Sequence, residues 1–271
     1  MKLNPGTGAT PDLSLRVSVA TYDKVLFPHP QTGMLMLALE RKATVREDGS
    51  LPVRAQPFGG GVRILNPATL QELTGDIEYD SQRSKQDRDF RILIPPSRWE
   101  AVKEYCLQHL ENQDDDQLEA SPRRELVEEF EETLGVDLKP DQYTVQSLGF
   151  VIEENPVWTE NWYARGYLTV RIYRTFRVDL VDPVLCQNIL AASQGHSDQD
   201  LGMAALRESQ SGGRGRTNSV LALPLNLVTE SYLALPPEMR YKKIVIENHE
   251  LDQSVLAVLE EVDVPQYQRM M

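Results

Sequence analysis

Cysteine and positive charge are both scarce in this sequence. Its 271 residues include two cysteines, Cys106 and Cys186, and neither belongs to a Cys-x-x-Cys pair. This scarcity argues against a structural zinc site and against a disulfide framework. The chain has 28 basic residues and 41 acidic ones, which gives a net charge of −13. That balance argues against general electrostatic binding to nucleic acid or to an anionic membrane. An anionic substrate would need help from a metal or from local basic residues.

Long apolar stretches are also missing. The sequence has no apolar run of about 18 residues, the length of a membrane-spanning helix, and no apolar segment of the signal-peptide type follows Met1 and Lys2. We therefore expect neither a membrane span nor a secretory signal, and a cytoplasmic protein. With 41% hydrophobic and 25% charged residues, the chain is expected to form a globular domain over residues 12–265.

The stretch from Ser121 to Gly135 is the most informative one. Ser121 suits an N-cap, Pro122 suits the first helical position, and Gly135 suits the left-handed residue that often follows a helix. These signals predict a helix over residues 122–134.

This predicted helix has an apolar face and an acidic face. The apolar residues recur at every fourth position, at Leu126, Phe130 and Leu134. Carboxylates occupy positions i, i+3, i+4 and i+7 of the other face, at Glu125, Glu128, Glu129 and Glu132. Repulsion destabilises a helix by roughly a few tenths of a kcal/mol per like-charged pair. A hard divalent cation such as Mg²⁺ or Mn²⁺ would relieve it. The alternative is an acidic face that is simply solvated.

Part of the helix matches a known motif. Residues 124–129, Arg-Glu-Leu-Val-Glu-Glu, have the Arg-Glu-apolar-x-Glu-Glu core of the Nudix box, and the chain resembles the Nudix hydrolases in this respect. The resemblance implies that Glu125, Glu128 and Glu129 hold Mg²⁺ or Mn²⁺ and that Arg124 orients the acidic face. Five residues separate Glu129 from Gly135 where the family has one. This extension is close to one helical turn and leaves the acidic face in register.

A glycine turn fits the family's order at a longer distance. Residues 58–61, Phe-Gly-Gly-Gly, resemble the turn that opens the box, where glycine lets backbone amides approach a ligand. Arg124 follows Gly61 by 63 positions where the family has 14, so about 49 residues are inserted. Asp116 stands where the family has an upstream glutamate, in an acidic run that is by default a solvated loop. The resemblance implies that Gly60 and Gly61 shape a phosphate-binding turn.

Strand and helix patterns elsewhere favour an α+β fold. Apolar patterns predict strands at 13–19, 34–39, 89–94, 144–152 and 164–178, and helices at 99–112 and 249–262. Residues 62–118 are predicted to form an inserted α/β subdomain. The polar segment 193–219 is predicted to be a mobile loop because it is rich in glycine and serine. The resemblance implies a single Nudix-like domain over 12–265, with a mixed, curved sheet flanked by helices.

The segment 153–162 lies between two of the predicted strands and would come near the acidic helix in the Nudix order. Trp158 and Trp162 offer rings that could stack on a base, and core packing is their alternative role. Glu153, Glu154 or Glu160 offers a general base or a further metal ligand, and the sequence does not distinguish among the three.

The resemblance implies a divalent-metal-dependent hydrolase that cleaves a phosphoanhydride bond in a nucleoside diphosphate linked to another group. Its expected partner is a small nucleotide-type substrate, without nucleic acid or membrane, and a homodimer is left open. The main alternative is a Nudix-like module that senses a nucleotide or binds a partner without turnover. A structural protein with a merely solvated acidic helix is the third hypothesis.

Overall fold

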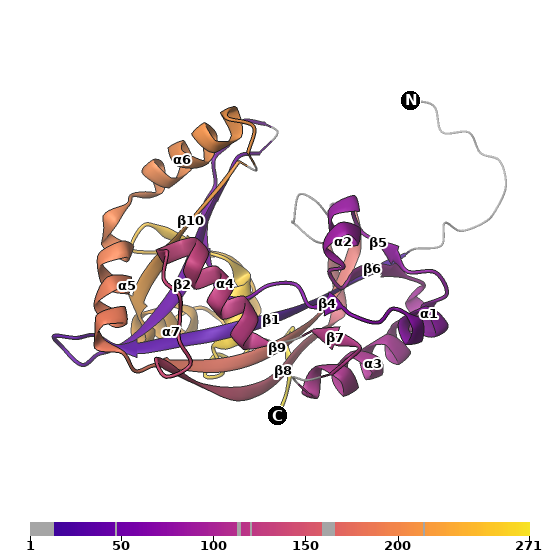
Figure 1. The fold of residues 1–271 in the computed structure, drawn as a ribbon. Coiled ribbons are helices and arrows are strands. Elements are labelled where there is room, and N and C mark those ends of the chain that lie inside the picture. The colour runs from indigo at the N-terminus through magenta and orange to yellow at the C-terminus, as the bar shows by residue number, and fades with distance from the viewer. Residues whose placement is uncertain (1–13, 47, 113–114, 120, 159–165, 214) are drawn as a thin grey trace. The chain divides into compact units, whose positions relative to one another are not determined.

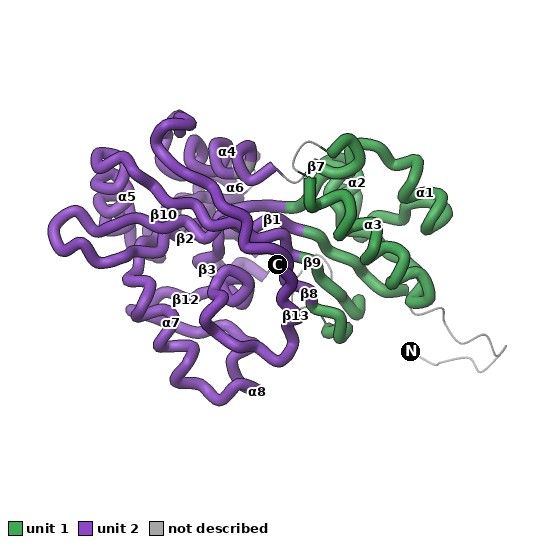
Figure 2. The backbone as a smooth tube through the Cα atoms, turned by 90° about the horizontal axis from the view of Figure 1, so that it is seen from below, with its two compact units in different colours: residues 1–19, 61–120, 153–172 green, residues 20–60, 121–152, 173–271 purple. Residues whose placement is uncertain are grey.

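The computed structural model describes residues 14–271 except 47, 113–114, 120, 159–165 and 214, and leaves out the side chain of residue 125. The chain forms two compact units, coloured separately in Figure 2. Unit 1 comprises residues 1–19, 61–120 and 153–172, and unit 2 comprises 20–60, 121–152 and 173–271. The fold is α+β, as the sequence predicted, with a curled sheet of mixed strand direction (Figure 1). In the described part of the chain, no helix is long and apolar enough to cross a membrane.

The strands of unit 2 follow the order β11-β12-β3-β2-β1-β9-β8-β13, and β10 also pairs with β2. Their bounds are β1 (Leu15–Pro28), β2 (Leu35–Thr44), β3 (Val53–Gln56), β8 (Tyr143–Trp158), β9 (Leu168–Leu180), β10 (Arg216–Pro224), β11 (Ile244–Ile246), β12 (His249–Leu251) and β13 (Gln268–Met270). The first residues of β1 and β9 and the last residues of β8 belong to unit 1. Strands β12 and β3 pair in parallel, whereas β2 pairs antiparallel with β1, β3 and β10.

Helices cover both faces of the unit 2 sheet. They are α4 (Pro122–Leu134), α5 (Pro183–Gly195), α6 (Asp198–Gln210), α7 (Leu225–Leu233), α8 (Pro237–Arg240) and the 3₁₀ helix η3 (Gln253–Val258). Met36 and Ala38 of β2 pack into a core with α4 and α5, while Leu37 and Leu39 pack into a second core with α7 and η3. A strand that is buried on both faces reads as a continuous apolar run. This explains the uninterrupted apolar sequence at the start of β2.

Helix α4 has the bounds that the sequence predicted. Ser121 precedes it in an extended conformation, but the described Ser121 side chain accepts no capping hydrogen bond. Gly135 ends it with φ 64°, in the left-handed region where glycine carries no Cβ penalty. Leu126 and Phe130 are fully buried in the core beneath the helix. Of the acidic residues, Glu128 and Glu132 are exposed, whereas Glu129 is 8% exposed.

The segment 193–219 differs from its predicted loop structure. It contains α6 and the first residues of β10. Ser197 and Asp200 form a capping box at the start of α6, and this local signal favours a helix. Leu201 and Ala205 are buried against Ala43 of β2, which stabilises the helix through packing.

The predicted helix at 249–262 is wrong. The structure has β12 followed by η3 in this segment. The five consecutive residues 255–259 are all fully buried, so the segment lacks the solvent-facing side that an amphipathic helix presents. Leu251, which lies inside the predicted helix, instead pairs with Ala55 of β3.

Unit 1 contains the segment that the sequence predicted to be an inserted subdomain. Its further elements are β4 (Arg63–Ile64), α1 (Ala68–Thr74), β5 (Glu78–Tyr79), α2 (Gln82–Asp87), β6 (Arg91–Ile94), η1 (Pro96–Arg98), α3 (Trp99–Glu111) and β7 (Leu118–Glu119). Strand β6 pairs with the start of β1 and with β5. Helix α3 buries Trp99, Val102, Cys106 and Leu110, the apolar stripe read from the sequence.

Candidate functional site

The glycine segment and helix α4 meet in unit 2. The backbone N–H of Gly59 donates a hydrogen bond of 2.5 Å to Oε2 of Glu129. Beside it, the rings of Phe58 and Phe130 contact each other with centroids 5.0 Å apart. The two partners of the hydrogen bond are 70 positions apart in the sequence. The fold thus brings the glycine segment against helix α4 despite the long segment between them.

Gly59 occupies a position that only glycine fits. The segment is extended rather than a free turn, because the N–H of Asp23 donates to the carbonyl of Phe58 at 2.8 Å and that of Thr21 donates to the carbonyl of Gly60 at 2.9 Å. Gly59 has φ +126°, and a Cβ there would collide with the carbonyl oxygen of Thr21. A residue without a side chain lets the backbone lie against β1 and present its amide to Glu129.

Glu129 belongs to a partly buried group of polar side chains that we call the β2–α4 cluster, made of Glu40, Lys42, Gln56 and Glu129. The ammonium of Lys42 forms an ion pair with Glu40 and lies 3.5 Å from Oε1 of Glu129. The amide Nε2 of Gln56 donates to Oε2 of Glu40 at 3.2 Å. Glu40 is fully buried and Glu129 is 8% exposed. One ammonium group therefore connects a carboxylate of the sheet with a carboxylate of the helix.

Burial and charge act in opposite directions in this cluster. Burial raises the pKa of Glu40, against the attraction of Lys42, and the negative charge of Glu132 raises it further. Burial lowers the pKa of Lys42, but the attraction of Glu40 and Glu129 outweighs that cost and raises it above the ordinary lysine value. Lys42 is therefore held as a cation in surroundings that are rich in acid.

The other charged residues of the box are more exposed. Nη1 of Arg124 donates to Oε2 of Glu128 at 2.8 Å, one helical turn away, and the Glu128 side chain is 56% exposed. Oε2 of Glu132 accepts a hydrogen bond of 3.3 Å from Asn218 of β10. Glu125 lies in α4, and its side chain is outside the described part of the structure.

The residues predicted at 153–162 belong to unit 1. Glu153 is fully buried and forms an ion pair of 2.8 Å with Arg171, and Glu154 accepts a hydrogen bond of 2.6 Å from Lys103. Trp158 is 63% exposed at the end of β8. Trp162 and Glu160 lie outside the described residues.

Two further predicted positions also fall in unit 1. Gly61 lies so close to the carboxylate of Asp89 that an added Cβ would stand 3.0 Å from its Cγ. Asp116 accepts a hydrogen bond of 2.8 Å from the side chain of Gln117 at an exposed position, as expected of a solvated loop. In unit 2 the structure brings together Glu129 and the glycine segment 58–60, with Arg124 and Glu128 on the same helix.

Sequence reasoning missed Glu40 and Lys42. The signal that could have found them is the alternation of β2: the face that carries Met36 and Ala38 toward α4 continues with Glu40 and Lys42. In a sequence, charged residues at the end of an apolar run are usually predicted to be exposed to solvent. Here β3 and β10 flank this part of β2 on its two edges, with Gln56 and Val220 as the partners of Glu40, and together they bury it.

The oxygen donors of α4 suit a hard divalent cation in kind. Among the side chains that the structure describes, no group of three histidine, cysteine, aspartate or glutamate residues could hold a metal ion. Mg²⁺, however, is commonly bound through one or two carboxylates, with water and substrate phosphates as the remaining ligands. Glu128 and Glu129 offer donors of that kind, although Glu129 is buried beside Gly59 and Glu128 is exposed beside Arg124.

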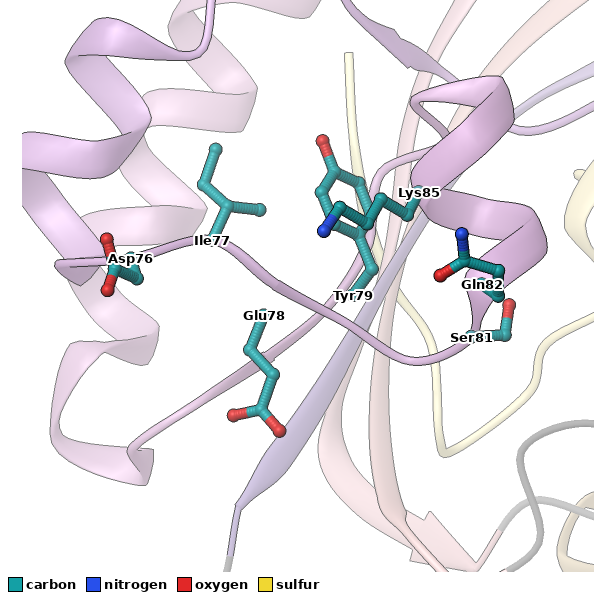
Figure 3. A pocket seen from close by; sticks show the side chains of 7 residues that line it. All are labelled: Asp76, Ile77, Glu78, Tyr79, Ser81, Gln82 and Lys85. Atoms are coloured by element: carbon teal, nitrogen blue, oxygen red, sulfur yellow. The ribbon is translucent and has the colours of Figure 1, made fainter.

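A separate hollow of about 470 Å³ lies in unit 1, where Lys85 of α2 and Tyr79 of β5 extend into it (Figure 3). Its remaining lining residues are Asp76, Ile77, Glu78, Ser81 and Gln82. None of the predicted catalytic, metal-binding or substrate-binding residues lines it. No protein-family model, curated protein or solved structure matches the chain. The resemblance to the Nudix box therefore rests on residues 58–61 and 124–129 themselves.

Proposed function

We propose that this protein is a divalent-metal-dependent hydrolase that cleaves a phosphoanhydride bond in a nucleoside diphosphate derivative. The observation that carries the proposal is the hydrogen bond of 2.5 Å from the Gly59 amide to the Glu129 carboxylate. It connects the glycine segment with the acidic helix, which are the two parts of a Nudix-like box.

Each residue of the box has a role in this proposal. Glu128 and Glu129 hold the cation, together with Glu125, whose part rests on the motif alone. The Gly59 amide fixes the orientation of the Glu129 carboxylate, and Arg124 restrains the otherwise exposed Glu128 through their 2.8 Å contact. When bound, Mg²⁺ or Mn²⁺ offsets the charge of diphosphate oxygens and lowers the pKa of an attacking water.

A second candidate is a nucleotide-sensing or partner-binding module without turnover. The observation that favours it is the position of Lys42, which pairs with Glu40 and also approaches Glu129 at 3.5 Å. An ammonium group there satisfies part of the negative charge that would otherwise attract a metal. The protein could then bind a nucleotide without activating a water.

Product release decides between these functions. The wild type is incubated with ADP-ribose, dinucleoside polyphosphates, nucleotide sugars and nucleoside triphosphates, each with Mg²⁺ or Mn²⁺. The same panel is run with Glu128→Gln, Glu129→Gln and the control Glu131→Gln, which changes an exposed residue of α4 off the acidic face.

We expect Glu129→Gln to lower turnover on the order of a hundredfold or more, with the fold retained because glutamine still accepts from Gly59. The Glu131→Gln control should match the wild type. Equal turnover in the wild type and Glu129→Gln would overturn the hydrolase. A panel without turnover, but with ligand-dependent thermal stabilisation, would establish the sensing module instead.

A further inference from the structure

We propose that Glu40 of β2 is a further cation ligand, and that a divalent cation binds Glu40 and Glu129 in place of the Lys42 ammonium. The inference rests on the proposed function for the presence of a divalent cation at α4. The inference goes beyond the proposed function in two ways. It assigns a metal ligand outside the Nudix-like box, and it makes the Lys42 ammonium a cation that the metal displaces.

The two carboxylate oxygens of Glu40 differ in their hydrogen bonding. Glu40 is fully buried, and its Oε2 meets both Lys42 and Gln56. Among the described residues, its Oε1 has no hydrogen-bond partner. A buried carboxylate oxygen without a partner is costly, and such atoms in native structures call for an explanation such as a bound ion.

The charge of the surroundings also favours a cation. Lys42 pairs with Glu40 and approaches Glu129, and the negative charge of Glu132 also acts on Glu40. Two nearby carboxylates can supply the protein ligands of Mg²⁺ or Mn²⁺, and water and substrate oxygens complete the shell. Glu40 stands on a strand paired on both edges, and Gln56 fixes the orientation of its carboxylate. Hydrogen-bonded neighbours of this kind tune a metal ligand.

The ammonium of Lys42 can move away from the two carboxylates and still remain near the site. Its side chain is 30% exposed, so its long aliphatic stem can turn the ammonium toward solvent. The same ammonium would then remain close to the cation and to any phosphate that the cation binds. A guanidinium in its place would hold the carboxylates through a rigid fork and resist displacement.

Mn²⁺ binding to the full-length chain tests the proposal directly. The Kd for Mn²⁺ is measured by electron paramagnetic resonance, without nucleotide, for the wild type, Glu40→Gln, Lys42→Met, Lys42→Arg and the surface control Glu131→Gln. We expect Glu40→Gln to weaken binding by about tenfold or more and Lys42→Met to strengthen it by about tenfold. Lys42→Arg should weaken Mn²⁺ binding several-fold. Because this variant keeps the positive charge, it tests the proposal even if Lys42→Met does not fold.

The outcomes separate this inference from the proposed function. Equal Mn²⁺ affinity in the wild type, Glu40→Gln and Lys42→Arg would overturn it, as would a wild type that binds no Mn²⁺. A wild type that hydrolyses substrate while Glu40→Gln keeps its Mn²⁺ affinity would retain the hydrolase and reject Glu40 as a ligand. A wild type that needs Glu40 for Mn²⁺ but turns over nothing would retain the site and reject the hydrolase.

Discussion

Both units bury charged side chains, but they balance the charge differently. In unit 1, the guanidinium of Arg16 pairs with Asp80 at 2.7 Å and that of Arg171 pairs with Glu153 at 2.8 Å. In unit 2, the β2–α4 cluster sets one ammonium against two carboxylates, and a carboxylate oxygen of Glu40 has no partner among the described residues. An ion pair balances its own charge, whereas an excess of buried acid favours a bound proton or a further cation.

If the proposed function holds, this difference separates a structural role from a functional one. Buried ion pairs are costly to break because one charge is left without its partner, although the intact pair adds little net stability. The balanced pairs of unit 1 are expected to affect stability when they are changed. The acid-rich cluster of unit 2 is expected to affect ligand binding as well. Substitutions that remove one member of each kind of group can test the contrast.

The largest effect is expected from breaking the pair of Arg171 and Glu153. Arg171→Met leaves a fully buried carboxylate without its guanidinium partner, which should lower the free energy of unfolding by roughly 3–5 kcal/mol. The measurement is urea unfolding. The double variant Arg171→Met/Glu153→Leu should recover most of the loss, because neither charge remains.

An exposed pair provides the control for that experiment. Arg83 and Asp87 lie one turn apart on α2 with side chains about half exposed. Arg83→Met should therefore change the free energy of unfolding by only about 0.5 kcal/mol. A similar loss in Arg83→Met and Arg171→Met would contradict the structural role given to the buried pair.

Gly59→Ala should produce the next largest effect. The added Cβ would meet the carbonyl of Thr21, so the segment must shift away from β1 and its amide must move from Glu129. We expect a loss of at least about 2 kcal/mol from strain and displaced packing. Gly49→Ala is the matched control, since Gly49 also has positive φ but no atom within 4 Å of its Cβ position. Its cost should be about 1 kcal/mol, and an equal cost at both sites would count against the steric argument.

The local parts of this comparison were predictable from the sequence. The bounds of α4 follow from Pro122 and Gly135, which act on their own backbone and need no distant partner. The apolar start of β2 likewise follows from residues next to one another. The capping of α6 by Ser197 and Asp200 was present in the sequence but was outweighed by a composition that is typical of loops.

The cluster itself depends on contacts between distant segments. Glu40 lies between Gln56 of β3 and Val220 of β10 on the sheet face that packs against α4, and no local pattern specifies this register. The same limit explains the error at 249–262, where complete burial of residues 255–259 replaces an amphipathic stripe. The contact of Gly59 with Glu129 was not predicted, because the two residues are 70 positions apart in the sequence.

The smallest effect is expected at Asp182, which belongs neither to the buried ion pairs of unit 1 nor to the β2–α4 cluster. Asp182 caps α5 by accepting hydrogen bonds from the amides of Val184 and Leu185, and it also accepts one from Gln142. The side-chain hydrogen bond with Gln142 is the main cause that lowers the pKa of Asp182 below its ordinary value of 3.8, followed by the two amide bonds. Its charged form is therefore favoured in the folded protein.

A carboxylate whose pKa is lower in the folded than in the unfolded state stabilises the fold at pH values above the unfolded-state pKa. That stability is lost as the pH falls through the folded-state pKa. Asp182→Ser keeps an oxygen that can cap the helix but does not titrate. We therefore expect the wild type to exceed Asp182→Ser in urea midpoint near neutral pH, and the gap to narrow below about pH 4. The measurement is a series of urea unfolding curves for both proteins across this range. A gap that stays constant through acid would mean that the hydrogen bonds of Asp182 do not depend on its charge.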